Sequence, residues 1–187
     1  MQHNTLQAYQ EVIRHCKQLF MDKHADYGSA WRVLRPTTLT DQIAIKVRRI
    51  ITIAQKKVQQ IPESVEQELI GVINYSIMAL LQLSLPAGEA SDMEEQEVSS
   101  AYGKTVANII ALLQKKNHDY DEAWRAMRIS SIVDIILMKL LRIKHIEDQG
   151  GGPRVSEGIA SGYQDIVNYA VFALLHLSEA PTTDDKG

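Results

Sequence analysis

Two pairs of cations stand in apolar stretches of the chain and could bind phosphate. Lys46 and Arg49 return 93 residues later as Lys139 and Arg142. Residues three apart on a helix share a face, so each pair would present its two cations side by side. A lysine ammonium and an arginine guanidinium placed together suit phosphate oxygens. The spacing therefore predicts phosphate contacts from these four residues.

Further polar and aromatic residues repeat with the cations, at an offset of 93 residues or, toward the end of each copy, of 94. We expect Arg32 and Arg125 to add phosphate contacts. A base or sugar would lie near the aromatic and amide side chains, which are Tyr27, Trp31, Tyr120, Trp124, Asn74 and Asn168. The repeated acids are expected to form a polar network with the cations, and these are Asp26, Asp41, Asp119 and Asp134.

The residues alone leave three interpretations of this set open. The first is the phosphate site. The second is a structural ion-pair network between helix two and a carboxylate on helix three, because burying an unpaired charge is costly. The third is a plain solvated face. The tryptophans and tyrosines are open to a structural interpretation as well, as anchors of a helix junction.

Metal binding depends on a pair of carboxylates that the chain divides between its two copies. An E-x-x-D pair would place two carboxylates on one helical face, where they could hold Mg²⁺. Copy one has Glu68 with Gly71, whereas copy two has Gly162 with Asp165. Either the two copies complete a shared site or neither binds metal. We expect no strong metal site, with Mg²⁺ as the candidate cofactor if there is one.

Other catalytic motifs are missing from the sequence. The glycines at 150–152 precede a proline and lack the lysine spacing of a phosphate-binding loop. His145, Glu147 and Asp148 stand near the end of helix two and are expected to be solvated helix-end residues. The sequence therefore leaves open whether the protein is an enzyme.

A duplicated set of residues requires a duplicated set of helices. The stretch "HADYGSAWRVLR" at 24–35 returns as "HDYDEAWRAMR" at 118–128, and "VINYSIMALLQLS" returns as "IVNYAVFALLHLS". The apolar periodicity predicts three helices in each copy, and the second helix, apolar nearly all round, is expected to be buried. The predicted helices span residues 5–23, 39–57 and 63–85, then 98–117, 131–147 and 155–177.

The chain is thus predicted to be all-α, with two three-helix repeats packed about a pseudo-twofold axis. Each half is too small to bury more than a marginal core, so docking the halves would supply the missing burial. The expected division is a first repeat at 1–85, an acidic linker at 86–97, a second repeat at 98–179 and a disordered tail at 180–187.

Composition limits the partners and the compartment. A net charge of −3 over 187 residues offers no basic excess for duplex nucleic acid. The single Cys16 excludes an internal disulfide. With no signal-peptide pattern and no membrane-length apolar run, we expect a cytoplasmic protein away from membranes. Homodimer formation is left open.

The pattern "K-x-x-D-Y-G-x-A-W … D-x-x-x-x-K-x-x-R … E … N-Y", from Lys23 to Tyr75, resembles the nucleotide modification associated domain family, type 1. Copy two, from Lys116 to Tyr169, resembles it again with Asp121 in place of the motif glycine. The resemblance implies a nucleotide-binding or nucleotide-processing protein with a small-molecule nucleotide as its ligand.

A looser similarity, in helix content and in the divided E-x-x-D pair, is to MazG-like all-α nucleoside triphosphate pyrophosphohydrolases. It implies Mg²⁺-dependent hydrolysis as an alternative, with Glu63 or Glu157 as the carboxylate that positions water. Helix two has Lys and Arg where that family would have paired glutamates. A non-enzymatic helical scaffold or partner-binding protein is the remaining alternative.

Overall fold

Each copy of the repeat forms three long helices with a short 3₁₀ turn between the first and second. The computed structural model describes residues 3–55, 64–85, 93–120, 122–150 and 156–179, without the side chains of residues 3–4, 116–120 and 156–157. Repeat one contains α1 (His3–Tyr27), η1 (Ala30–Val33), α2 (Pro36–Gln55) and α3 (Val65–Ser84). Repeat two contains α4 (Glu95–Tyr120), η2 (Ala123–Ala126), α5 (Ile129–Asp148) and α6 (Ser156–Glu179). The all-α prediction and the tandem three-helix repeats are confirmed.

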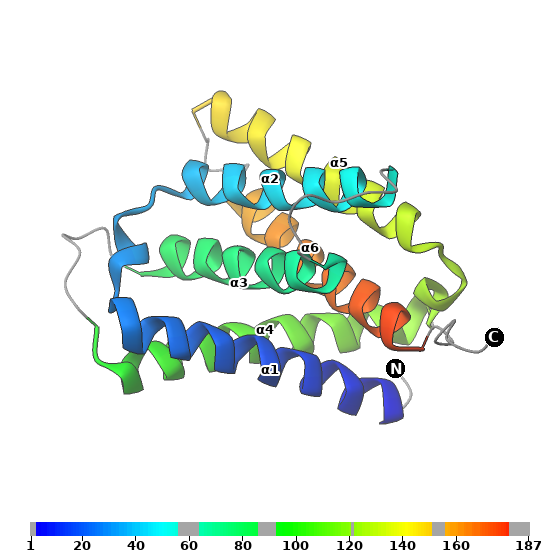
Figure 1. Cartoon of the computed structure of the whole chain (residues 1–187), viewed down its shortest axis with the longest axis horizontal. Helices are drawn as coiled ribbons and strands as arrows, with labels where there is room; N and C mark the ends of the chain where they lie inside the picture. The colour runs from blue at the N-terminus through cyan, green and yellow to red at the C-terminus, as the bar shows by residue number, and fades with distance from the viewer. Residues whose placement is uncertain (1–2, 56–63, 86–92, 121, 151–155, 180–187) are drawn as a thin grey trace, which may run out of the picture.

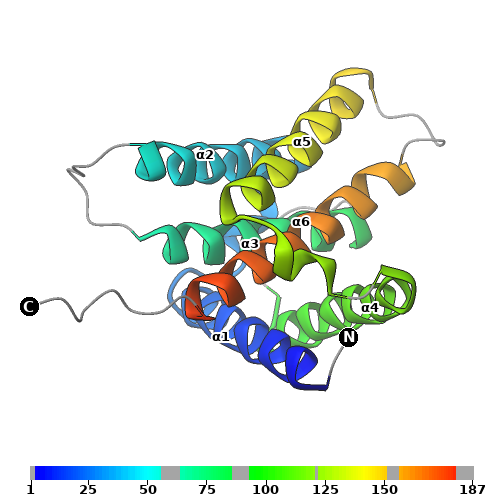
Figure 2. The same cartoon turned by 90° about the vertical axis from the view of Figure 1, so that its right-hand side faces the viewer.

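The helices form three layers, each made of equivalent helices from the two repeats (Figures 1 and 2). One outer layer contains α2 and α5, the central layer contains α3 and α6, and the other outer layer contains α1 and α4. The contacts are reciprocal, since α2 packs on α3 as α5 packs on α6, and α1 reaches α6 as α4 reaches α3. A pseudo-twofold axis between the two repeats requires this reciprocal pattern of helix contacts.

The core lies around the central layer, because α3 and α6 are covered on both sides. In α3 nearly all side chains from Leu69 to Leu81 are buried or partly buried. The prediction that the second helix is buried all round is wrong, since Met138 and Leu141 of α5 are each 55% exposed. The helix lies in an outer layer, so only one of its apolar faces meets the core. No helix of the described residues is long and apolar enough to cross a membrane.

Two tyrosines tie each first helix to the third helix of the other repeat. Tyr9 donates a hydrogen bond to Asn168 Oδ1 at 2.8 Å, and Tyr102 donates one to Asn74 Oδ1 at 2.9 Å. The two tyrosines are 93 residues apart, the offset of the other repeated residues, but sequence analysis did not single them out. Asn74 also donates to the Cys16 carbonyl at 3.0 Å. The asparagines expected at a base therefore hold helices together.

Replacing Tyr9 by Phe is expected to destabilise the protein by about 1–3 kcal/mol, because it leaves the Asn168 oxygen without this bond in the core. Asn168 is only 7% exposed. Tyr102→Phe is expected to cost less, since Asn74 is only partly buried. Urea unfolding measures both, with Tyr27→Phe, on an exposed side chain, as the control. Equal stability of Tyr9→Phe and the wild type would contradict a role for the cross-repeat bond.

Candidate functional site

A buried carboxylate holds the two predicted phosphate-binding cations of repeat one. Glu68, 1% exposed, lies 3.1 Å from Lys46 Nζ and 3.2 Å from Arg49 Nε. The carboxylate comes from the first turns of α3, whose start is fixed by a capping box between Ser64 and Gln67. Two cations thus share one carboxylate, and the Lys46 and Arg49 side chains remain partly exposed.

The glycine at position 71 lets the lysine reach this carboxylate. A Cβ atom at Gly71 would lie 2.5 Å from both Cδ and Cε of Lys46, so the lysine stem crosses α3 where there is no side chain. In repeat two the acid stands at the equivalent of Gly71. Lys139 Nζ contacts Asp165 Oδ2 there at 2.7 Å. Each half of the divided E-x-x-D pair therefore supplies the carboxylate that pairs with the lysine of its own repeat. The two carboxylates stand at positions of the third helix that are one helical turn apart.

Gly71→Ala and Gly162→Ala are expected to differ in sign. Alanine at 71 meets only the flexible end of Lys46, and an alanine in a helix gains about 1 kcal/mol over glycine. Alanine at 162 lies 2.9 Å from Cδ1 of the buried Ile143, and such overpacking costs about 1–3 kcal/mol. Thermal unfolding of both variants checks this. If Gly71→Ala is the more destabilising, the lysine stem is held more rigidly than its contacts indicate.

A cavity of about 280 Å³ opens beside the Lys46 ammonium. It lies between α1, α2 and α3 and is lined by Lys23, Lys46 and Gln67, together with Asn74 and Tyr75. The Lys46 ammonium lies 5.9 Å from the Tyr75 ring centroid. Lys23 is exposed at the edge of this cavity. This is a cationic recess with an aromatic wall.

A second cavity of about 190 Å³ adjoins the first and has an aromatic lining. Phe20, Lys23, Tyr75 and Met78 line both cavities. The second cavity adds, among others, Tyr27, which is 72% exposed, together with His24, Gly28 and Trp31 from the end of α1 and from η1. Gly28 turns the chain between them with φ 59°, a conformation that glycine adopts readily. The cationic and aromatic residues predicted in repeat one thus line connected space.

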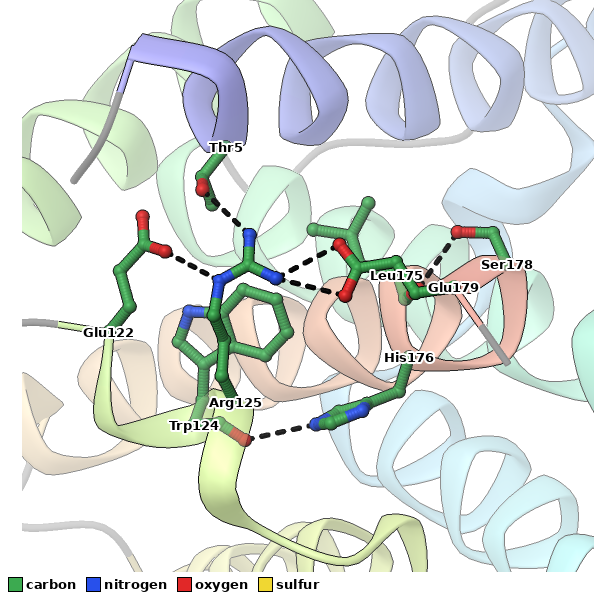
Figure 3. Close-up of polar contacts among 8 residues, drawn as sticks. All are labelled: Thr5, Glu122, Trp124, Arg125, Leu175, His176, Ser178 and Glu179. Carbon is green, nitrogen blue, oxygen red and sulfur yellow. Dashed lines mark hydrogen bonds and ion pairs between the residues drawn. The ribbon is translucent and has the colours of Figure 1, made fainter. Parts of the chain in front are cut away.

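In repeat two the equivalent tryptophan is covered. Trp124 is 4% exposed, and the Phe172 ring stacks on it at 4.7 Å with an interplanar angle of 2°. The Arg125 guanidinium lies 4.6 Å from the same indole centroid (Figure 3). Met78 takes the place of Phe172 in repeat one and lines the cavities there. A base has no open indole face to use in repeat two.

Arg125 is occupied by protein groups on all sides of its guanidinium. It donates to Glu122 at 2.6 Å, to both Glu179 oxygens at 2.9 Å and to Thr5 at 2.9 Å (Figure 3). The hydrogen bond to Glu122, followed by the one to Glu179, raises the pKa of Arg125. Two carboxylates neutralise this predicted phosphate ligand, so the arginine anchors η2 to α1 and α6.

Arg32, the counterpart of Arg125, is held by an amide instead. It donates to Gln82, whose Nε2 donates in turn to the backbone carbonyls of Arg32 and Leu34 at 2.9 and 2.7 Å. His176 takes the place of Gln82 in repeat two and contacts the Trp124 carbonyl at 3.0 Å (Figure 3). The third helix of each repeat thus holds the neighbouring 3₁₀ turn through one side chain. The sequence repeat did not point to these two residues, because Gln82 and His176 differ in type.

The remaining predicted residues are spread around the molecule. Asp41 pairs with Lys144 and so links α2 to α5. Arg142, Asp26 and Asp134 are exposed. Four predicted side chains lie outside the described residues, and these are Asp119, Tyr120, Glu63 and Glu157. The described part of the chain contains no group of three His, Cys, Asp or Glu side chains able to hold a metal ion.

A polar cluster joins α2 of repeat one to α5 and α6 of repeat two. Thr40 Oγ1 lies 2.8 Å from Glu147 Oε1 and 2.5 Å from the Tyr163 hydroxyl. Glu147, which was expected to be solvated, is partly buried and lies where α2 packs beside α5. Burial raises the pKa of Glu147, while hydrogen bonds from Thr40 and Tyr163 partly oppose this.

Glu147→Gln is expected to change how stability depends on pH. A raised pKa in the folded state favours the protonated acid, so its stabilising effect is full below the ordinary value of 4.5 and is lost as pH rises through the folded pKa. The wild type should therefore lose stability relative to the variant across that rise. Urea unfolding at a series of pH values measures the difference. For the exposed Glu94→Gln control, the difference in stability from the wild type is expected to be the same at every pH. The same result for Glu147→Gln would contradict the raised pKa.

Lys23 stands in the repeated motif but was not among the predicted site residues. Its counterpart Lys116 stands at the same 93-residue offset, which was the available signal. Met78 gave no such signal, because Phe172 replaces it. That exchange decides which indole is covered, and it becomes visible only when α3 and α6 are packed beside the 3₁₀ turns.

Comparison with known proteins gives one result. The family model described as nucleotide modification associated domain 1 matches residues 23–83 and 116–177, which is more than half of the chain and falls once in each repeat. No curated protein and no solved structure matches the chain. The similarity to MazG-like enzymes stays a prediction. The chain belongs to the nucleotide modification associated domain 1 family and carries that domain in two tandem copies.

Proposed function

We propose that repeat one binds a small-molecule nucleotide in its two adjoining cavities and that repeat two supports this site structurally. The observation that carries the proposal is the difference between the two tryptophans. Trp31 lines a cavity that connects to Lys46, whereas Trp124 is covered by Phe172 and Arg125. Ligand sites are typically clefts of roughly 300–1,000 Å³, and the two cavities together reach the lower part of that range.

The phosphate end is the recess beside Lys46 and Lys23. An ammonium paired with a buried carboxylate binds an anion poorly if the pair is neutral. Here Arg49 also pairs with Glu68, so Lys46 shares its carboxylate with a second cation. In repeat two Lys139 pairs with Asp165, and Arg142 is exposed. Repeat one is favoured as the anion-binding half because Lys23 and Lys46 line one recess there.

The base end is the aromatic cavity. Tyr27, Trp31 and Tyr75 line it with Phe20, and side chains of this kind bind the faces of nucleobases by stacking. One ligand would span from the cation to the aromatic wall, because four residues line both cavities. A sugar would then lie beside Lys23, Tyr75 and Met78.

The melting temperature of the protein against a panel of nucleosides and nucleotides tests the proposal. A ligand at a hundred times its dissociation constant stabilises by about 2.7 kcal/mol, which shifts the transition measurably. We expect nucleotides to raise the melting temperature and Trp31→Ala to reduce the rise. If no nucleotide raises it, the ion pairs are structural and the protein is a helical scaffold.

A further inference from the structure

The outer layer formed by α2 and α5 presents apolar side chains to solvent. Ile45 of α2 is 51% exposed, and Met138 and Leu141 of α5 are each 55% exposed. In Figures 1 and 2 the other described helices all lie on the inner side of α2 and α5, so the outward faces of these two helices form one side of the molecule. The α2/α5 face is defined by six exposed residues, which are Ile45, Arg48, Asp134, Met138, Leu141 and Arg142.

The apolar residues of the two helices meet near the pseudo-twofold axis. Ile45 and Met138 stand at equivalent positions, 93 residues apart, and each lies in the middle of its helix. Asp41, near the start of α2, pairs with Lys144, near the end of α5, so the two helices run in roughly opposite directions (Figure 1). The pseudo-twofold relation applies the same contact to the other ends, and the middles of the two helices therefore cross.

Charges flank the apolar centre of α5 in a fixed order. Asp134 stands four residues before Met138, Arg142 stands four residues after it, and all three side chains are exposed. Residues four apart lie on the same face of a helix. An identical helix laid antiparallel across Met138 would bring each Asp134 opposite an Arg142. The outward face of α5 is thus complementary in charge to a copy of itself.

The same order of charges recurs on α2. Asp41 and Arg49 flank Ile45 at the same spacing of four residues. Within the chain, Asp41 pairs with Lys144 and lies at one end of the face. Arg49 pairs with Glu68. Helix α5 therefore carries the charges that are best placed to meet a partner.

The size of the face suits a dimer at the weaker end of specific association. Each helix has 20 residues and is about 30 Å long, so two such helices side by side cover about 600 Å². Two copies in contact would bury about 1,200 Å² in total, which is the low end for specific interfaces. Symmetric dimers use one patch twice about a twofold axis, and such a patch must complement itself.

We propose that a second copy of this chain docks on the α2/α5 face in a twofold-symmetric dimer. The apolar centres of the two copies pack together, and each Asp134 pairs with the partner's Arg142. The dimer is independent of the proposed nucleotide site, because the recess at Lys46 lies between α1, α2 and α3 and thus on the inner side of α2.

Sedimentation velocity of the full chain tests the proposal at protein concentrations from about 1 to 200 μM, which suits an interface of this size. We expect the mass to rise with concentration from that of one chain, 21.0 kDa, toward twice that value. A single species with the mass of one chain at every concentration overturns the proposal.

Met138→Glu tests the apolar centre of the face. We expect it to weaken the dimer about tenfold or more, because symmetry places two like charges in the middle of the interface. Leu112→Glu is the matched control, since it alters a leucine of α4 that is 40% exposed in the opposite outer layer. A dimer that withstands Met138→Glu, or that both variants weaken equally, overturns the assignment of the face.

An exchange of charges tests the orientation of the two copies. Asp134→Arg is expected to weaken the dimer about tenfold, because it brings arginines opposite each other at two symmetric places. Combining it with Arg142→Asp reverses both charges, so the double variant should dimerise like the wild type. Recovery in the double variant also excludes misfolding as the cause of the first loss. A loss that the second change does not relieve overturns the antiparallel pairing.

Discussion

Lys46→Met is expected to weaken nucleotide binding by about ten- to a hundredfold, and Lys139→Met is expected to leave it unchanged. The two lysines occupy equivalent positions in the second helices of the two repeats. Lys46 lines the recess of about 280 Å³ in repeat one. A charge-assisted hydrogen bond contributes about 1.5–3 kcal/mol, which corresponds to the expected loss. Titration calorimetry with the tightest-binding nucleotide measures it.

The free energy of unfolding distinguishes a loss of nucleotide binding from misfolding of the variant. Methionine retains the apolar stem of the lysine, and Glu68 keeps its contact with Arg49 in the Lys46 variant. Lys139→Met removes the 2.7 Å pair with Asp165 and so serves as a variant with a comparable structural change. Urea unfolding of both variants shows whether each is folded at the titration temperature. Nucleotide affinity that survives Lys46→Met would make its ion pair purely structural, and equal losses in both would place the site elsewhere.

Trp124→Ala is expected to destabilise the protein by about 3–5 kcal/mol, as is usual for a large aromatic side chain in a core. Trp124 contacts the Phe172 ring at 4.7 Å, the Arg125 guanidinium and the His176 ring. Trp31→Ala is expected to cost clearly less, because Trp31 is only partly buried and its ring contact is an edge contact with Phe20 at 6.1 Å. Chemical denaturation measures the free energy of unfolding of the two variants, whose tryptophans occupy equivalent positions in the two repeats.

The loss of nucleotide affinity is expected in the opposite order, larger for the Trp31 variant than for the Trp124 variant. Loss of Trp31 removes an aromatic wall of the base cavity and should weaken nucleotide binding about tenfold, since stacking contributes about 1–3 kcal/mol per base. Trp124→Phe keeps an aromatic ring in the core and provides a folded variant if the alanine variant does not fold. Nucleotide affinity that falls with Trp124→Phe but not with Trp31→Ala would move the site to repeat two.

The helices could be predicted because their signals are local. The duplicated motifs predicted two repeats, and the structure has three long helices in each. The third helix was predicted from residue 63 and begins at Val65, where Ser64 and Gln67 form the capping box. The fourth was predicted from residue 98 and begins at Glu95. Such boundaries depend on neighbouring residues and on contacts within one turn, which the sequence displays directly.

The site was predictable in its residue types and not in its partners. The repeated motif predicted Lys46 and Arg49 as site residues, and the structural interpretation predicted a carboxylate on the third helix as their partner. The structure shows that carboxylate as Glu68, a residue selected as a metal ligand candidate. The Lys46 stem crosses α3 over Gly71, and the space it occupies there depends on how the two helices pack. The space available to a side chain between packed helices cannot be predicted from motif spacing.

By itself the sequence determined the helical class, the duplication and the family, because periodicity and repeated motifs are properties of neighbours along the chain. Only the tertiary structure decided that the two copies differ. Phe172 covers Trp124 while Met78 leaves Trp31 beside a cavity, and Glu179 neutralises Arg125 from the end of α6. These contacts join residues about 50 positions apart in sequence, as in Arg125 and Glu179 with a separation of 54. Their effect depends on side-chain shape and charge at the packed faces, so identical motif residues acquire different surroundings.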